Sequence, residues 1–242
     1  MNADRTEDGE PTEAADSTAG SARTRLAPDW FERLYEQDDD PWRFATSEYE
    51  RRKYSSTLAA LGGRRFTRGL EVGCSVGVFT ALLAEHCEQL VAIDVSERAL
   101  ALAAHRLSDR NGVSLERAAF PEQMPGGRWD LVLCSEVLYY LDSPALELAI
   151  RRLTEVLRAG GTVLAVHWRP ATKSYPFTGD AVHELMLERL GRWHALDSRA
   201  DRYRLDRFDG FDGFDSVDGF DGIEGVDGFN GLEGSDGADE LR

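Results

Sequence analysis

The sequence predicts an α/β protein built on a doubly wound, mostly parallel sheet. Apolar runs alternate with segments of helical period from Leu70 to Trp168, which is the pattern of strands joined by crossover helices. The first run carries an acid, Glu71, and leads into a glycine turn from Gly73 to Gly77 that opens a helix. Asp94 ends the next run, at roughly the 20-residue spacing at which such folds bind ribose hydroxyls. These features predict a nucleotide-like ligand at the carboxyl end of the sheet.

Two helices are expected before the first strand. Residues 29–37, DWFERLYEQ, carry aromatic and apolar side chains at helical spacing, which indicates a helix that covers the core. Pro41 ends this helical region. A second helix is expected over residues 47–61, where Ser47 caps the first turn and Glu50 completes a capping box.

The remaining elements follow the glycine turn in strict alternation. Ser96 is the expected N-cap of the second crossover helix, and an Ala-Gly-Gly segment ends the last one. Helices are expected over residues 78–86, 96–109 and 143–158, and strands over residues 90–95, 113–118, 129–135 and 162–168.

A chain of 242 residues suits one ordinary α/β domain with flanking tails. No apolar run reaches the roughly 18 residues that a membrane span needs, and the chain does not begin with a basic and then apolar leader, so we expect a cytoplasmic protein without membrane partners. Cys74, Cys87 and Cys134 lack C-x-x-C spacing, which disfavours a disulfide framework and a zinc site. No metal cofactor is expected.

The net charge of −16 is concentrated at the two ends of the chain. Residues 1–27 hold six acids and three bases, and residues 206–242 hold twelve acids and two bases, which leaves 26 acids and 23 bases between them. The middle therefore has no basic excess, and a nucleic-acid partner is disfavoured.

Both ends are expected to be disordered. Residues 1–27 have few apolar side chains to bury, and residues 209–242 loosely repeat an apolar residue, an acid and a glycine. A calcium-binding repeat is the alternative for the second segment, because closely spaced Asp and Gly can surround a hard cation. The repeat does not keep a nonapeptide register, so we favour a solvated tail.

Four motifs resemble those of class I S-adenosylmethionine-dependent methyltransferases: EVGCSVG, VAID, WDLV, and RAGG before a strand. Three further stretches, DDPWRFATSEYERRKY, SEVLYYL and VHWR, are similar to the nodulation protein S family, and the resemblance covers residues 30–208. It implies a seven-stranded Rossmann-like sheet ending in an antiparallel pair, for which residues 193–198 and 203–208 are the candidates. The domain is then expected over residues 28–208, with a helical cap over 28–62 and a core over 63–208.

The resemblance implies S-adenosyl-L-methionine as the cofactor. Glu71 is expected to serve its amino group, and Asp94 to accept its ribose hydroxyls. Gly73 and Gly77 would let the amino acid end of the cofactor lie against the main chain. The alternative for each acid is a buried carboxylate at a strand end, without any ligand.

Further cofactor contacts are expected from the helical cap and the strand ends. The resemblance implies Trp42 beside the sulfonium and Arg43 beside the carboxylate, unless they are a structural tryptophan and a surface arginine. Cys74, Phe79, Val95, Phe120 and Ser135 are the other expected contacts.

Two departures bear on the choice of cofactor. Cys74 to Val76 interrupts the G-x-G-x-x-G pattern that a nicotinamide dinucleotide prefers, and Glu71 favours a cation over a pyrophosphate. The third strand ends in Ala118-Ala119-Phe120, where many relatives have an acid that binds adenine. The Phe120 main chain or Glu122 would bind the ring instead, and a non-catalytic family member is the alternative.

The acceptor is expected at the ends of the fourth and fifth strands. An amine must lose a proton before it accepts a methyl group, so a carboxylate or an imidazole is needed nearby. Glu136, with Tyr139 behind it, is the first candidate to remove that proton or to orient the amine, and His167 is the second. A helix-capping Glu and a core His are the alternatives. Asp180 and His183 either line the mouth of the site or, with Thr178, belong to a capped helix start.

The resemblance implies N-methylation of a small molecule, with an amino sugar or glycoconjugate as the acceptor class. O-methylation of a hydroxyl compound is the closest alternative, and the sequence does not separate the two. From a different class of protein, a non-catalytic scaffold that presents the acidic tail to a partner is a further alternative.

Overall fold

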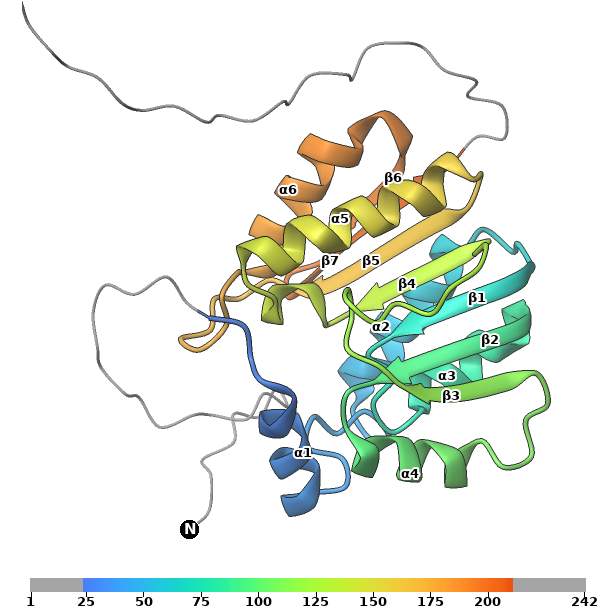
Figure 1. Ribbon diagram of the computed structural model, residues 1–242, viewed down its shortest axis with the longest axis vertical. Coiled ribbons are helices and arrows are strands. Elements are labelled where there is room, and N and C mark those ends of the chain that lie inside the picture. Colours follow the sequence, from blue (N-terminus) through green and yellow to red (C-terminus); the bar gives the residue numbers. More distant parts are fainter. Residues whose placement is uncertain (1–23, 211–242) are drawn as a thin grey trace, which may run out of the picture.

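Seven strands form one mixed sheet in the computed structural model, which describes residues 24–210 (Figure 1). The strand order is β3-β2-β1-β4-β5-β7-β6, in which the first five strands are parallel and β7 is antiparallel to both β5 and β6. This arrangement confirms the predicted fold class, including the antiparallel pair. The strands are β1 Phe66–Val72, β2 Cys87–Asp94, β3 Val113–Arg117, β4 Leu131–Ser135, β5 Thr162–Trp168, β6 His194–Arg199 and β7 Tyr203–Asp209.

Six α-helices lie among the described residues, and three of their starts carry the expected side-chain caps. Ser47, Ser96 and Thr178 each accept a hydrogen bond from a main-chain N–H one turn on, so the capping interpretation of Thr178 is correct. The helices are α1 Pro28–Gln37, α2 Glu48–Ala60, α3 Val78–Leu83, α4 Glu97–Arg106, α5 Ser143–Arg158 and α6 Gly179–Leu190, with 3₁₀ turns η1 Ala84–His86, η2 Leu138–Tyr140 and η3 Gly191–Trp193.

Side chains of the central strands alternate between two hydrophobic layers. In β4, Leu131 and Leu133 pack with α2 and α3, whereas Val132 and Cys134 pack with α5 and α6. Because side chains on a strand alternate with a period of two, a run that is apolar throughout fills both layers. The unbroken apolar character of this strand therefore reflects burial on both faces.

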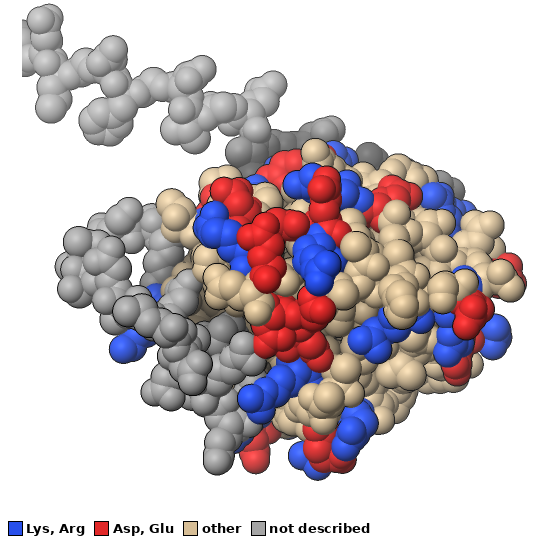
Figure 2. Space-filling model, turned by 90° about the horizontal axis from the view of Figure 1, so that it is seen from below, with Lys and Arg blue, Asp and Glu red and all other residues tan. Residues whose placement is uncertain are grey.

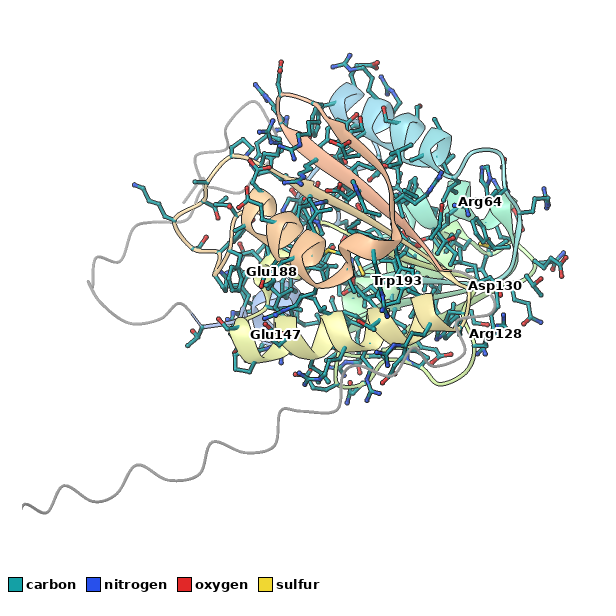
Figure 3. All side chains as sticks on the ribbon, turned by 90° about the horizontal axis from the view of Figure 1, so that it is seen from above. Arg64, Arg128, Asp130, Glu147, Glu188 and Trp193 are labelled. Atoms are coloured by element: carbon teal, nitrogen blue, oxygen red, sulfur yellow. The ribbon has the colours of Figure 1, made fainter. Side chains whose placement is uncertain are left out.

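Helices α5 and α6 lie side by side over the antiparallel end of the sheet, as the view in Figure 3 shows. Arg189 of α6 pairs with Glu147 of α5 at 3.1 Å and with its neighbour Glu188 at 3.5 Å. Trp193, in the turn after α6, is buried in the same layer. Helices α5 and α6 therefore cover the part of the sheet in which β5 pairs with β7.

Helix α1 and the first turns of α2 lie near the carboxyl ends of the parallel strands, and the rest of α2 packs on one face of the sheet. Helix α1 packs against α4, and Arg98 at the start of α4 pairs with Asp39 at 2.7 Å (Figure 1). The Leu26 N–H donates to the Tyr140 carbonyl at 3.1 Å, so the chain already contacts the core before Pro28, where the domain was predicted to begin. The rest of both predicted tails lies outside the described residues.

Acidic and basic side chains are interspersed on the face of the molecule that Figure 2 shows. No helix in residues 24–210 combines the length and the apolar character that crossing a membrane would require. The three cysteines, Cys74, Cys87 and Cys134, are all buried and free.

Substituting Gly77 by Ala should destabilise the protein more than the same change at Gly63. Both glycines have positive φ, +75° and +72°, a conformation that costs an alanine about 1 to 2 kcal/mol. A Cβ at Gly77 would lie 3.0 Å from the Ala103 Cβ, whereas a Cβ at Gly63 would meet no atom within 4 Å. Crowding should therefore add about 1 to 3 kcal/mol at Gly77 alone.

Urea unfolding of G77A and of the matched control G63A measures both free energies. Equal losses of stability in the two variants would contradict the close packing of the glycine turn against α4.

Candidate functional site

A pocket opens where the parallel strands end, under the two N-terminal helices. It encloses about 1310 Å³, part of it open to solvent. Parallel strands bring the residues at their carboxyl ends to one edge, and this edge is where an open α/β sheet binds its ligands. Of the predicted site residues, the pocket is lined by Trp42, Glu71, Gly73, Cys74, Phe79, Asp94, Val95, Phe120, Ser135, Glu136 and Tyr139.

Asp94 holds the glycine turn in place from the end of β2. Its carboxylate accepts hydrogen bonds from the Ser75 N–H at 2.8 Å and the Ser96 N–H at 3.0 Å. Gly73, with a φ of +76°, donates its N–H to the Ile93 carbonyl at 2.8 Å. Burial raises the pKa of Asp94, and the main-chain N–H groups oppose that rise. The carboxylate thus faces the pocket from a position fixed by the turn that it supports.

Glu71 is buried at the floor of the pocket, with 3% of its surface exposed. Its Oε2 atom is buried and accepts no hydrogen bond from the residues that the structure describes. Burial raises the pKa of Glu71 to about 8; the nearby Thr80 hydroxyl opposes the rise, and the Asp94 carboxylate adds to it. A buried carboxylate with an unpaired oxygen gains strongly from a cationic hydrogen-bond donor.

The cap covers the pocket with aromatic side chains. The Tyr35 hydroxyl donates to Ser75 Oγ at 2.6 Å, which links α1 to the glycine turn. Trp42 lies edge to face with Tyr35 at 5.6 Å and stacks on Phe44 at 5.7 Å. The Trp42 indole Nε1 is buried and has no partner among the described residues. It is therefore a hydrogen-bond donor that faces a lined cavity.

Glu136 is fully hydrogen-bonded at the end of β4. Its Oε1 accepts from Lys53 Nζ at 2.6 Å, and its Oε2 accepts from the Tyr139 hydroxyl at 2.6 Å and from the Trp168 N–H at 2.8 Å. Its backbone has a φ of +56°, an unusual conformation for a glutamate, which these contacts hold in place. Three donors leave little capacity to take a proton, so the geometry favours the orienting role over the proton-removing role.

Among the pocket residues that sequence reasoning missed are two buried charged side chains, Glu50 and Lys53. Lys53 is 2% exposed, and its Nζ lies 2.9 Å from Glu50 Oε1 in addition to its contact with Glu136. Burial lowers the pKa of Lys53, but Glu136 and Glu50 outweigh it and the net shift is upward. Burial raises the pKa of Glu50, although Lys53 opposes the rise. Glu50 therefore does not close the predicted capping box, because its carboxylate pairs with this buried lysine.

His167, predicted as the second candidate for the acid or base, is not among the residues that line the pocket, and its surroundings match the core histidine of the alternative interpretation. The ring is fully buried, and its Nε2 accepts a hydrogen bond from the Leu138 N–H at 3.2 Å. Because a main-chain N–H can only donate, the His167 Nδ1–H must donate to His183 Nε2, 3.0 Å away. The His183 Nδ1–H then donates to Asp206 at 2.5 Å. Both rings are neutral links that fix the main chain after Glu136.

Four other predicted residues lie away from the pocket. Arg43 is exposed, so it is the surface arginine of the alternative interpretation. Gly77 begins α3 and packs on α4. Glu122 is exposed and pairs with Arg25 at 2.5 Å; Arg25 lines the pocket, whereas Glu122 does not. Asp180 pairs with Arg169 at 3.0 Å and does not line the pocket.

Comparison with known proteins identifies relatives over most of the described chain. The model of the nodulation protein S (NodS) family matches residues 28–195. Nodulation protein S of Sinorhizobium fredii is 34% identical over 125 residues, which are 51% of this chain and 58% of that protein. This chain therefore spans less than two thirds of the length of that relative. Nodulation protein S of Azorhizobium caulinodans is 28% identical over 175 residues, covering 69% of this chain and 84% of the relative.

One solved structure matches over nearly its whole length. The N-methyltransferase NodS from Bradyrhizobium japonicum WM9, in complex with S-adenosyl-L-homocysteine, is 26% identical to this chain. The superposition covers 75% of this chain and 97% of that chain, with a TM-score of 0.63. The sheet and its covering helices are therefore shared with that protein.

The buried histidines should make the fold sensitive to acid between pH 6.5 and 5. Burial lowers the pKa values of His167 and His183, so the unfolded chain takes up protons first as the pH falls below about 6.5. Stability should be complete above that pH, and should fall below it by up to about 1.4 kcal/mol per pH unit for each ring.

Urea unfolding across this pH range tests the effect. Replacing His183 by Asn should reduce the slope by about one proton, whereas His105→Asn, an exposed position on α4, should leave the slope unchanged. If the stability of the wild-type protein stayed constant from pH 7 to pH 5.5, His167 and His183 would not be the neutral, hydrogen-bonded pair described above.

Proposed function

Because this chain belongs to the nodulation protein S family, we propose that it is an S-adenosyl-L-methionine-dependent methyltransferase acting on a small-molecule amine. The observation that carries the proposal is Glu71, a buried carboxyl group with an unpaired oxygen in a pocket that Asp94, at the end of the neighbouring strand, also lines. A related protein of known structure binds S-adenosyl-L-homocysteine, the demethylated form of that cofactor.

The residues of the pocket fit this cofactor. Glu71 would bind its ammonium group, because the Oε2 atom has no other partner in the described part of the chain. Asp94 keeps further lone pairs after accepting two N–H groups, so it would bind ribose hydroxyls. The buried Trp42 indole N–H would donate to the cofactor carboxylate in place of the predicted Arg43. Gly73, Cys74, Phe79, Val95, Phe120 and Ser135 would supply the remaining wall.

The cofactor, when bound, supplies a methyl group on a sulfonium that is already activated. The protein then mainly has to align the acceptor with that methyl, an effect that supplies roughly 7 to 11 kcal/mol in well-oriented reactions. Aromatic side chains of the cap line the pocket, and the contacts of Glu136 with Lys53 and Tyr139 fix the wall at which the acceptor would lie.

An amino sugar or a related glycoconjugate is the acceptor class that we propose. The relatives named above are nodulation proteins, and one of them is named as an N-methyltransferase. Tyr139, Tyr140 and Trp168 line the pocket on the acceptor side, and aromatic side chains suit the apolar face of a sugar ring.

Titration calorimetry with S-adenosyl-L-homocysteine tests the cofactor half of the proposal. We expect heat from a single site, and then a mass gain of one methyl group on amine acceptors incubated with S-adenosyl-L-methionine. No heat on titration would refute the proposal, and methylation restricted to hydroxyl compounds would replace N-methylation by O-methylation.

Cofactor binding should release close to one proton at pH 7. Glu71 has a pKa of about 8 in the free protein, so it is mostly protonated at pH 7, and binding an ammonium group requires the ionised form. Affinity for S-adenosyl-L-homocysteine should therefore rise as the pH increases from 6 to 8 and level off above pH 8.

Calorimetry at pH 7 in two buffers of different ionisation enthalpy counts the protons. Glu71→Gln should abolish the release and weaken binding by about 10- to 100-fold, which corresponds to one charged hydrogen bond. The control is Glu116→Gln, at an exposed position on β3, which should bind and release protons like the wild type. Proton release that persists in E71Q would assign it to another group.

A further inference from the structure

Three ionisable side chains, Glu50, Lys53 and Glu136, form a buried cluster on one wall of the pocket. Side-chain exposures are 9%, 3% and 13%, and Lys53 Nζ contacts both carboxylates. Two carboxylates and one ammonium leave one negative charge without a countercharge inside the cluster. Burying such a charge is costly unless it is paired, so the cluster suits the binding of one further cation.

The free hydrogen-bonding capacity of the cluster lies on Glu50. Its Oε1 contacts Lys53, whereas its Oε2 is buried and has no hydrogen-bond partner in residues 24–210. Glu136, in contrast, accepts from three donors. Glu50 lines the pocket, and its Oε2 is the carboxylate oxygen of the cluster with no hydrogen-bond partner among the described residues.

Glu50 and Glu71 both lie close to Tyr54, which follows Glu50 by one turn along α2. The Tyr54 ring stacks on Phe79 at 4.8 Å, and both rings line the pocket. After burial, Glu50 and Glu71 are the two largest influences that raise the pKa of Tyr54, so the phenol is close to both carboxylates. Two buried carboxylates, each with an unpaired oxygen, thus line one cavity close to the same aromatic ring.

We propose that Glu50 is the group that receives the protonated acceptor amine and removes its proton, an inference that rests on the proposed function. Glu71 then binds the cofactor ammonium and Glu50 binds the acceptor ammonium, with Tyr54 close to both carboxylates.

The proton transfer is balanced within the pair. One N–H bond of the ammonium breaks, its electron pair stays on nitrogen, and an O–H bond forms at Glu50 Oε2. The amine becomes neutral with a free lone pair, and Glu50 becomes a neutral acid. Burial already raises the pKa of Glu50 towards that form, and Lys53 keeps the carboxylate ionised until the amine arrives.

The test replaces Glu50 by Gln, which keeps the shape of the side chain and removes its basicity. Methyl transfer from S-adenosyl-L-methionine to glucosamine and its β-1,4-linked oligomers should fall by about 10²- to 10⁴-fold in kcat. The Kd for S-adenosyl-L-homocysteine should stay within threefold of wild type. The remaining rate should rise about tenfold per pH unit below the pKa of the amine, because E50Q must draw on amine that is already neutral.

Two further variants separate the proton-accepting role from a structural one. Glu48→Gln lies on the exposed face of the same helix and should behave like the wild type. Glu50→Asp keeps a carboxylate on a shorter stem and should retain more activity than E50Q.

Each remaining outcome decides the proposal. Three results would overturn the role of Glu50 and leave the proposed function standing. In the first, E50Q transfers methyl groups within threefold of the wild-type rate; in the second, E50D is no more active than E50Q. In the third, E50Q no longer binds S-adenosyl-L-homocysteine. A wild-type protein that binds S-adenosyl-L-homocysteine but methylates none of these amines also overturns it. Failure of the proposed function would show instead as a wild-type protein that does not bind S-adenosyl-L-homocysteine.

Discussion

The site depends on an imbalance of buried charge at the carboxyl edge of the sheet. Glu71, Asp94, Glu136 and Glu50 reach one pocket, and Lys53 is the buried lysine that lines it. Burial opposes ionisation of each isolated carboxylate, as the pKa of about 8 at Glu71 illustrates. A pocket of this kind gains most from ligands that bring positive charge, and both a sulfonium amino acid and a protonated amine do so. The residues that line the pocket therefore favour a cationic ligand.

The parallel direction of the strands brings these acids together, while the hydrophobic layers remain apolar. Strands β1, β2 and β4 run in parallel, so the acids near their ends converge on one edge while the apolar runs before them fill both hydrophobic layers. The antiparallel pair contributes indirectly. Strand β7 carries Asp206, and the chain of hydrogen bonds from Asp206 through His183 and His167 ends at Leu138, two residues after Glu136. The pocket wall that carries Glu136 is therefore connected to the antiparallel part of the sheet.

The sequence was sufficient for the strands and for the acids at their ends, because period, apolar runs and a glycine turn are local signals. The sequence was insufficient for residues whose burial depends on how one element packs on another. Glu50 and Lys53 resemble an ordinary surface pair three residues apart on a helix, and only the packing of α2 over the strand ends buries them. His167 lies near the end of an apolar strand, where ligand-binding residues are expected, but the pairing of β5 with β7 and the position of α6 place it in the core.

Measurement of the Glu71 carboxyl titration by ¹³C NMR tests the central claim most directly, with the signal assigned by its absence in E71Q. The account predicts a pKa near 8 in the free protein, and a large fall when S-adenosyl-L-homocysteine binds, because the ligand ammonium stabilises the ionised form. A Glu71 carboxyl that titrates near its ordinary value of 4.5 in the free protein, or that does not respond to the ligand, would contradict the account.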